Sequence, residues 1–303
     1  MIRKYSIFFF LPLLLYCYIL SGCDSVSKPA DDGGGTKDTI YKIDYEFGVK
    51  NLRPLRNGES YALWVRKAPE SEWQLASDSK FNNFPVRDST TIYGSFTSKI
   101  DPDHIREALV TIELTKTPVS PGIALLKGTI AGRVGPMTMS HLGDFSKTTG
   151  GLTFTSPEGD TDDYKHEFYL MKPGAQPSIS FLPTLNSGWR YGIWVADYEF
   201  FPYHEFLYGL FDRAAGHDSD SGTDAYEFPG GQKKQPLDVP TGRIIVTLEP
   251  PLYGDSLRYK GAELLYVLQL NRFVNIERDK FYAMSNVSGI WLPSGRITFI
   301  RRQ

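Results

Sequence analysis

The sequence predicts an all-β protein built from two tandem antiparallel β-sandwich domains. From Ile40 onward, short apolar runs are broken by Gly, Pro, Asn and Asp, and no long stretch has helical periodicity. One block of strand-forming and turn-forming residues occurs twice, 130 positions apart: Leu52, Leu55, Gly58, Tyr61, Trp64 and Val65 recur as Leu182, Leu185, Gly188, Tyr191, Trp194 and Val195. A second block, LVTIE at 109–113, returns as IVTLE at 245–249. Matched blocks in the same order indicate that one unit has been duplicated.

Each copy contains a strand that carries a tryptophan. Residues 61–65 and 191–195 alternate with the period of two expected of a pleated strand. Trp64 shares its strand face with Ala62, and Trp194 shares its face with Gly192. One interpretation is an exposed aromatic platform for a sugar or a peptide, and the other is a buried ring packed over a small neighbour. Because both copies keep the tryptophan and its small partner, we favour the buried ring.

The segment before each tryptophan strand has the composition of a turn. Gly58 and its counterpart Gly188 are expected to adopt a positive φ, which glycine tolerates best. The leucines of this segment are expected to plug the end of each sandwich, and they are Leu52, Leu55, Leu182 and Leu185. The six residues added between the blocks of the second copy are expected to lie in surface loops.

The order of these motifs resembles the C-terminal domain of the anti-sigma-K factor family. Members of that family run Leu-x-x-Leu-x-x-Gly-x-x-Tyr-x-x-Trp and then, after a glycine-containing segment, Val-Thr-x-Glu-Pro. The first copy has VTIE at 110–113 without the proline, and the second has VTLEP at 246–250. The likeness covers roughly residues 41–128 and 168–268. It implies an immunoglobulin-like antiparallel sandwich outside the cytoplasm, but not control of a sigma factor, because the N-terminal helical domain and membrane span of that family are not recognisable here.

The matched blocks place the first domain at residues 39–128 and the second at 129–303. Beyond the blocks, strands are expected in the second domain near residues 137–140, 152–155, 167–171, 281–284, 289–292 and 297–300. The last of these belongs to a C-terminal extension of the second domain. Apolar and polar residues alternate along it, and its arginines fit a guarded edge strand.

Residues 1–22 have the features of a lipoprotein signal peptide. A basic start precedes an apolar run at 7–20, and LSGC at 20–23 forms the cleavage region. The run is shorter than the ~20 residues that a helix needs to cross a bilayer. The ending resembles the lipobox of bacterial lipoproteins, which implies that Cys23 becomes the lipidated first residue, carries acyl chains such as palmitate, and anchors the protein to a membrane. An uncleaved N-terminal anchor with an incidental cysteine is the alternative.

Residues 23–38 are expected to form a flexible tether, because they are rich in Gly, Asp, Ser and Lys and poor in apolar side chains. Without Arg3 and Lys4, 31 basic residues stand against 35 acidic ones, a formal charge of about −4 that argues against nucleic acid as a partner. The other cysteine, Cys17, lies in the apolar run, so no disulfide is expected. We therefore expect an extracytoplasmic, lipid-anchored envelope protein, with the outer membrane preferred.

An acidic loop is the main candidate metal site in the sequence, and Asp160, Asp162 and Asp163 form a weaker version of the same feature. Asp218, Asp220 and Asp224 stand at near-alternate positions, so their oxygens could face one hard cation such as calcium. The loop lacks the bidentate glutamate of a helix–loop–helix calcium site. A solvated insertion loop is therefore the preferred interpretation, and no other cofactor is expected.

The sequence carries no recognisable catalytic motif. His204 and Glu205 begin a metalloprotease pattern, but Tyr208 stands where the second histidine is required. There is no nucleophile elbow, phosphate-binding glycine loop or free nucleophilic cysteine. Only scattered carboxylates remain as conceivable catalysts, as in a glycosidase. We expect a non-catalytic protein, and keep a glycan-active enzyme as the third hypothesis.

Surplus aromatic residues are the candidate ligand contacts. An aromatic-rich run occupies residues 200–211, where the first copy is more polar. It could cover an interface between the domains, the favoured interpretation, or offer a stacking surface for a saccharide or a peptide. The residues chosen as candidate contacts are Phe201, Tyr203, Trp189 and Trp291. The function expected is protein interaction at the envelope, with glycan binding as the alternative.

Overall fold

The protein is described by a computed structural model that covers residues 39–55, 58–76, 89–115, 118–155, 165–169, 171–172, 176–185, 188–197, 204–213, 237–238, 242–251, 260–270 and 280–302. Within these ranges the regular structure consists of strands with three single-turn helices, two of them 3-10 turns. None of the helices found there has the length and apolar character that a membrane span requires.

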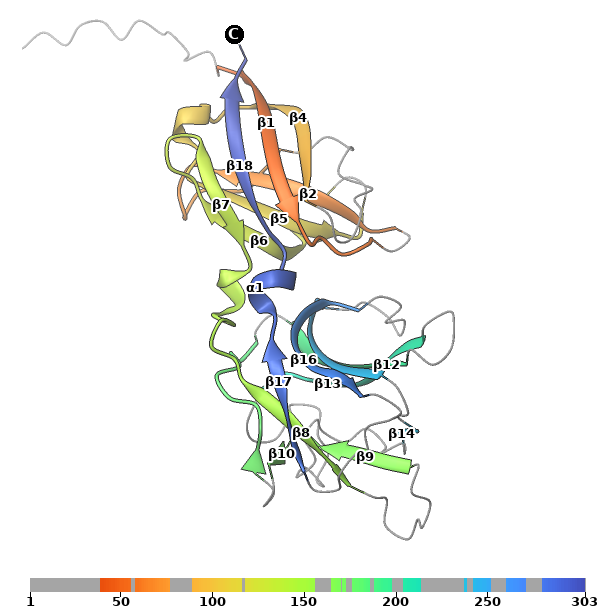
Figure 1. Ribbon diagram of the computed structural model, residues 1–303. Coiled ribbons are helices and arrows are strands. Elements are labelled where there is room, and N and C mark those ends of the chain that lie inside the picture. The colour runs from red at the N-terminus through yellow and green to blue at the C-terminus, as the bar shows by residue number, and fades with distance from the viewer. Residues whose placement is uncertain are drawn as a thin grey trace, which may run out of the picture. The chain divides into compact units, whose positions relative to one another are not determined.

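The first sheet contains eight strands and curls into a nearly closed barrel. Its hydrogen-bonded order is β3-β2-β5-β6-β7-β18-β1-β4. In this order the strands are Gln74–Leu75, Ser60–Arg66, Glu107–Glu113, Ile123–Thr129, Val134–Thr138, Ser294–Arg301, Tyr41–Lys50 and Thr90–Ser98. Every pairing is antiparallel. Figure 1 shows β18, in blue, between β7 and β1, both of which come from the first half of the chain.

The second sheet, also antiparallel, curls into a half-barrel. Its order is β13-β12-β15-β16-β17-β8-β9-β14. In this order the strands are His204–Phe211, Arg190–Asp197, Gly242–Glu249, Ala262–Leu270, Phe281–Asn286, Gly150–Thr155, Lys165–Tyr169 and Leu237–Asp238. A separate ribbon pairs β10 (Met171–Lys172) with β11 (Gln176–Pro177). The helical turns are η2 (Pro102–His104), η3 (Ser140–Leu142) and α1 (Ser288–Trp291).

The prediction of an all-β chain with two antiparallel units is confirmed, but each unit is one continuous curled sheet and not two sheets packed face to face. Strand curvature accounts for the difference. The β5–β6 ladder shifts register between Val110 and Thr111, and the β15–β16 ladder shifts between Val246 and Thr247. Such bulges bend a strand and increase its twist, so one sheet can fold round its own apolar side chains. Alternation along a strand does not distinguish this arrangement from a sandwich.

The two sheets repeat the same local geometry at matched positions. Gly58 and Gly188 have φ of +88° and +78°, as predicted. The residues that open the two turn segments, Asn51 and Phe181, also have positive φ, of 59° and 58°. The Tyr61 hydroxyl donates a hydrogen bond of 2.6 Å to the backbone oxygen of residue 53, and the hydroxyl of its counterpart at 191 donates one of 2.5 Å to that of residue 183. The two matched blocks therefore share their local backbone geometry.

The tryptophan strands are buried on both faces. Tyr61, Leu63 and Val65 belong to a large apolar core, which also contains residues of the second sheet. Trp64 points to the opposite face, where it packs with Ala62 and half-buried neighbours in a smaller cluster. Trp194 forms the equivalent small cluster in the second sheet. The two rings are 1% and 2% exposed, which confirms the buried interpretation and places both rings outside the main core.

The division between the sheets differs from the predicted boundary at 128/129. The strand β7, assigned from the sequence to the second domain, pairs with β6 and β18 in the first sheet. The C-terminal strand β18 also belongs to the first sheet, and it is a central strand between β7 and β1 and not a guarded edge. Residues 289–292, predicted as a strand, lie in α1 and the residue after it. Alternation shows that a segment is a strand, but it does not show which sheet the strand joins.

Candidate functional site

Each sheet holds one buried glutamate in a hydrogen-bond cluster with its tryptophan. In the first sheet the Trp64 indole N–H donates to Glu113 Oε1 (3.1 Å) and to Thr111 Oγ1 (2.9 Å). The Thr111 hydroxyl and the Gly122 amide N–H donate to the same carboxylate oxygen, the amide at 2.9 Å. Glu113 is 4% exposed, and its three donors explain how a carboxylate can be buried here.

The second sheet repeats this cluster. Glu249 Oε1 accepts from the Trp194 indole N–H (2.8 Å), the Thr247 hydroxyl (2.5 Å) and the Gly261 amide (2.9 Å). Gly192 leaves the space that the cluster needs, because a Cβ at this position would lie 2.7 Å from Thr247 Oγ1. The small partner of the tryptophan thus makes room for a hydrogen-bond cluster as well as for the ring. Trp64 and Trp194 therefore have equivalent surroundings.

Burial raises the pKa of Glu249 above its ordinary value of 4.5, although the donors Thr247, Gly261 and Trp194 act to lower it. Its second oxygen, Oε2, is buried and accepts no hydrogen bond. Glu263 shows the opposite balance. Burial acts to raise its pKa, but Lys260 and Arg243 outweigh that effect and hold the pKa below its ordinary value.

These two shifts predict opposite pH effects on stability. A raised folded pKa contributes stability at low pH that is lost as pH rises through it, so Glu249→Gln should gain stability relative to the parent protein above pH ~4.5. A lowered folded pKa contributes stability above the ordinary value, so Glu263→Gln should lose stability at neutral pH, and its deficit should shrink as the solution is acidified. Urea unfolding at several pH values measures both. If the stabilities of both variants, relative to the parent protein, changed with pH in the same way, the two pKa directions would be wrong.

A pocket forms where side chains of both sheets and of α1 meet. Its volume is about 90 Å³, smaller than the roughly 300 Å³ at which typical small-ligand pockets begin. Trp189 and Trp291 supply its aromatic surface. Its polar side chains are Asn51, Arg53, Lys260 and Glu263. The Asn51 amide donates to the backbone oxygens of Ile290 (2.6 Å) and Leu292 (3.3 Å), which ties the first sheet to the α1 segment.

The charges that line the pocket are compensated by ion pairs. Arg53 contacts Glu59 at 2.8 Å, and Lys260 contacts Glu205 at 2.7 Å and Glu263 at 3.0 Å. The Arg53 side chain is only 10% exposed, and its Nε has no hydrogen-bond partner. The pocket thus presents two indole rings and charges compensated by ion pairs, while the unused N–H donor of Arg53 is buried. That combination suits a neutral, hydroxyl-bearing or carbonyl-bearing ligand better than a strong anion.

The structure brings together two of the four candidate ligand contacts. Trp189, which is 4% exposed, and the half-buried Trp291 line the same pocket although they are a hundred residues apart. Phe201, Tyr203, Cys23 and the acidic loop with Asp218, Asp220 and Asp224 lie outside the described residues. Sequence reasoning missed Arg53, Lys260 and Glu263. The only available signal was a departure from the repeat, since Pro183 stands in the second copy where Arg53 stands in the first.

The other described aromatic residues form no exposed row. Trp73 is half-buried, with the Arg66 guanidinium 4.4 Å from the centre of its ring. In the described part of the aromatic-rich run, Phe206 is 40% exposed, whereas Phe211 is fully buried against Tyr191. The most exposed large aromatic side chain of the described residues is Phe181, at 71%. Besides the pocket, the exposed aromatic side chains of the described residues include Phe181, Tyr93 and Phe206.

A second cavity adjoins the first through Trp189. Its volume is about 490 Å³, and Glu113, His141 and Pro251 are among its lining residues. Burial lowers the pKa of the His141 ring below its ordinary value of 6.5, although hydrogen bonds to backbone oxygens act to raise it. The histidine therefore presents a neutral ring to this cavity at neutral pH.

Comparison of the chain with protein-family models, with curated proteins and with solved structures finds no match.

Proposed function

We propose that this protein is a non-catalytic lipoprotein of the cell envelope, anchored through Cys23 and acting as a protein-binding module. The lipobox at 20–23 and the tether that follows support the anchor. The hydrogen bonds received by Glu113 and Glu249 support binding over catalysis, because each carboxylate is used as a buried acceptor in its own sheet. The likeness to the anti-sigma-K factor C-terminal domain, with its immunoglobulin-like sandwich, remains a proposal that rests on the repeated motifs.

One observation carries the protein-binding proposal. Phe181 is held at φ +58° and leaves 71% of its surface in solvent. A bulky side chain is unusual in this conformation, and exposure of a large aromatic ring gains nothing in the isolated protein. At the matched position the first sheet has Asn51, whose amide is used in hydrogen bonds. Strained and exposed residues are concentrated at functional sites, so Phe181 is the residue proposed to contact a partner.

Phe181→Asn tests this role, because it copies the residue of the first sheet. The folded protein should be as stable as the parent or more stable by up to about 1 kcal/mol, since asparagine tolerates positive φ. A photoreactive amino acid at position 181 should form a covalent adduct with one envelope protein in living cells. The same amino acid at Tyr93, which is 67% exposed in the other sheet, is the control. Identical adducts at both positions, or none at 181, would contradict the proposal.

Glycan binding is the second candidate, and the pocket with Trp189 and Trp291 favours it. Aromatic rings stack on a sugar, and polar lining side chains such as Asn51 and Lys260 can bind its hydroxyls. A glycan array probed with the mature chain (residues 23–303, with Cys23→Ser) should show binding that Trp291→Ala removes. Trp73→Ala changes a half-buried tryptophan outside the pocket and should leave the binding intact. Silence across the array would remove this candidate.

A further inference from the structure

The two sheets have the same strand order, but one position is filled from a different part of the chain. Reading both orders from the same edge, β2, β5, β6 and β7 match β12, β15, β16 and β17. The next place in the second sheet holds β8, which directly precedes its neighbour β9 in the sequence. The same place in the first sheet holds β18, which lies at the opposite end of the chain from its neighbour β1.

The first sheet therefore receives one of its strands from a distant segment. By analogy with β8, the missing strand would precede β1, where the sequence has the Gly-rich and Asp-rich segment 23–38. That composition is poor in strand-forming residues. Residues 41–138 supply β1 to β7, and β18 fills the slot between β7 and β1.

The slot is fully adapted to β18. The strand aligns eight residues with β1 and five with β7. Ile297 and Phe299 are 0% and 1% exposed, and the Phe299 ring meets that of Phe96 edge-on at 6.2 Å. Removal of β18 would leave two unpaired strand edges and an apolar gap. A slot of this kind is the binding mode in which an extended segment completes a sheet.

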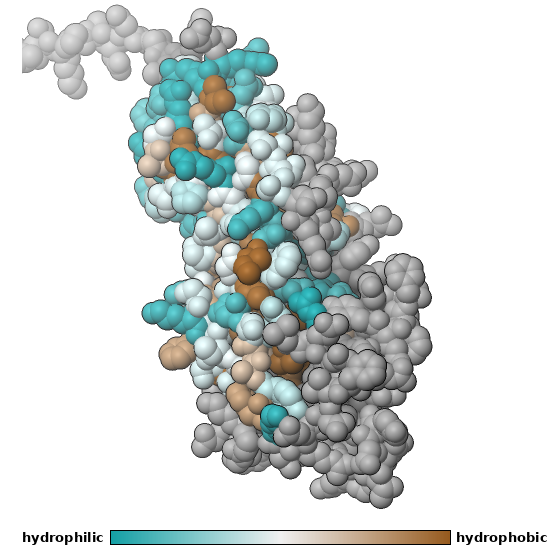
Figure 2. Space-filling model, in the orientation of Figure 1, coloured by the Kyte–Doolittle hydropathy of each residue, from teal (hydrophilic) through white to brown (hydrophobic). Residues whose placement is uncertain are grey.

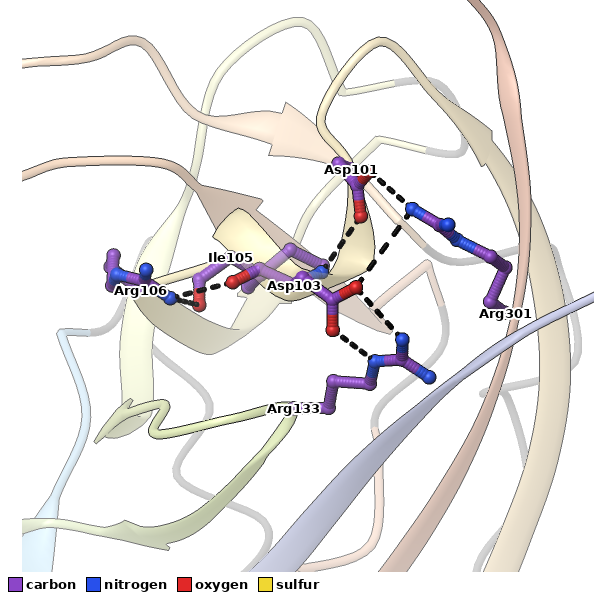
Figure 3. Close-up of polar contacts among 6 residues, drawn as sticks. All are labelled: Asp101, Asp103, Ile105, Arg106, Arg133 and Arg301. Atoms are coloured by element: carbon purple, nitrogen blue, oxygen red, sulfur yellow. Dashed lines mark hydrogen bonds and ion pairs between the residues drawn. The ribbon is translucent and has the colours of Figure 1, made fainter.

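Charged side chains hold the free end of β18 (Figure 3). Arg301, the last residue of the strand, forms an ion pair with Asp101 and lies 3.9 Å from an oxygen of Asp103. Arg133, next to β7, binds Asp103 through two nitrogens. Asp101 also accepts the amide N–H of Asp103 at 3.0 Å and so caps η2. Together with the hydrogen bond from the Arg302 amide to the Lys42 backbone oxygen (3.1 Å), these exposed contacts hold the C-terminal end of β18.

The link from β18 back to the second sheet is short. Seven residues, 287–293, separate β17 from β18, and they include the single turn of α1. Ile290 in this turn is 61% exposed, and Figure 2 shows apolar surface gathered around α1 on this face. The strand before the link, β17, pairs with β16 at two positions and with β8 at four. A short connection that leads into a strand completing another sheet is an arrangement in which proteins exchange an identical element between copies.

We propose that the slot between β7 and β1 is a self-association site that takes β18 from a second copy of this chain, joining two copies by reciprocal strand exchange. Every strand pair of the closed molecule is preserved in the exchanged one, because the donated strand has the same sequence. In the exchange, residues 287–293 of each copy change conformation. The first sheet of each copy is then completed by β18 of the other copy. The proposal does not depend on the partner proposed for Phe181 or on the pocket.

Disulfide trapping tests this in the mature chain with Cys23→Ser, which has no cysteine. Glu46 and Thr298 are register partners in β1 and β18, within reach of a disulfide. Glu46→Cys and an isotope-labelled Thr298→Cys protein are mixed, unfolded together, refolded at high protein concentration and oxidised. Mass spectrometry should identify dimers linked between positions 46 and 298 of different copies. The control mixture combines Glu46→Cys with Thr129→Cys, two positions that are not neighbours. The yield of dimers linked between 46 and 298 should be roughly tenfold higher than the yield of cross-linked dimers in the control, because only neighbouring thiols are held together.

A chain with both Glu46→Cys and Thr298→Cys should close its disulfide internally when oxidised in the folded state, and should then stay monomeric through the same refolding. Arg301→Ala should speed formation of the exchanged dimer several-fold in mixtures held at sub-denaturing urea, because β18 must detach before it exchanges and the contacts at its end oppose detachment. A cross-link yield equal to that of the control mixture would overturn the proposal. Failure of the double variant to close its own disulfide would overturn it as well, because β18 would then not lie beside β1.

Discussion

Replacement of Trp194 by alanine is expected to lower the free energy of unfolding by about 3–5 kcal/mol, the usual cost of removing a fully buried tryptophan. The change leaves a cavity in the small cluster with Ala196 and Ile245, and it takes one donor from the buried oxygen of Glu249. Trp64→Ala should cost a similar amount, because Trp64 has the same partners in the first sheet. Urea unfolding of the mature chain, followed by circular dichroism, gives the values.

Trp194→Phe separates the two parts of this effect. Phenylalanine keeps most of the apolar ring but has no N–H to donate, so a loss of about 1–3 kcal/mol is expected from the weakened hydrogen bonding of Glu249. A cost below about 1 kcal/mol for both alanine variants would mean that neither tryptophan is packed as described. Very different costs for the two alanine variants would show that the duplicated clusters are not equivalent.

Cys23→Ser in the full precursor should abolish membrane attachment of the protein. The thiol of Cys23 is the only group in the proposed lipobox that can take the lipid, so labelled palmitate should no longer be incorporated. The protein should then leave the membrane fraction, since anchoring depends on the acyl chains. Labelling followed by membrane fractionation measures both outcomes.

Cys17→Ser is the matched control, because Cys17 lies inside the apolar run and before the proposed cleavage position. This variant should incorporate the label and remain in the membrane fraction. If Cys23→Ser instead stayed with the membrane and kept the mass of residues 1–22, the uncleaved anchor would be the correct interpretation. The lipoprotein proposal would then fail, while the description of the two sheets would stand.

The repeat made much of the fold predictable from one sequence. Matching residues 130 positions apart identified both tryptophan strands, and the positive φ of Gly58 and Gly188 followed from turn chemistry. The curled sheets were not predictable in this way. Period-two alternation reports that one strand face is buried, but a bulge such as that at Val110 and Thr111 decides whether the sheet packs on another sheet or on itself.

The candidate site was predictable only where a residue type stood out. Trp189 and Trp291 were chosen as surplus aromatic residues, and they meet in one pocket. The two tryptophans lie in one pocket because the segment after β17 runs back to the first sheet. Residue types alone do not reveal such a long-range contact. Arg53 gave no signal as a charge, since arginines are common at turns. Only the absence of its counterpart in the second copy distinguished it.

The place of β18 also sets the order in which the protein can be completed during synthesis. Residues 41–138 leave the ribosome first, yet the barrel that they form closes only when residues 294–301 arrive. The sheet whose first seven strands are synthesised earliest is thus completed last. A nascent chain must keep that gap shielded from other chains while some 150 further residues are added, so stalled or prematurely terminated translation products should be unusually dependent on chaperones.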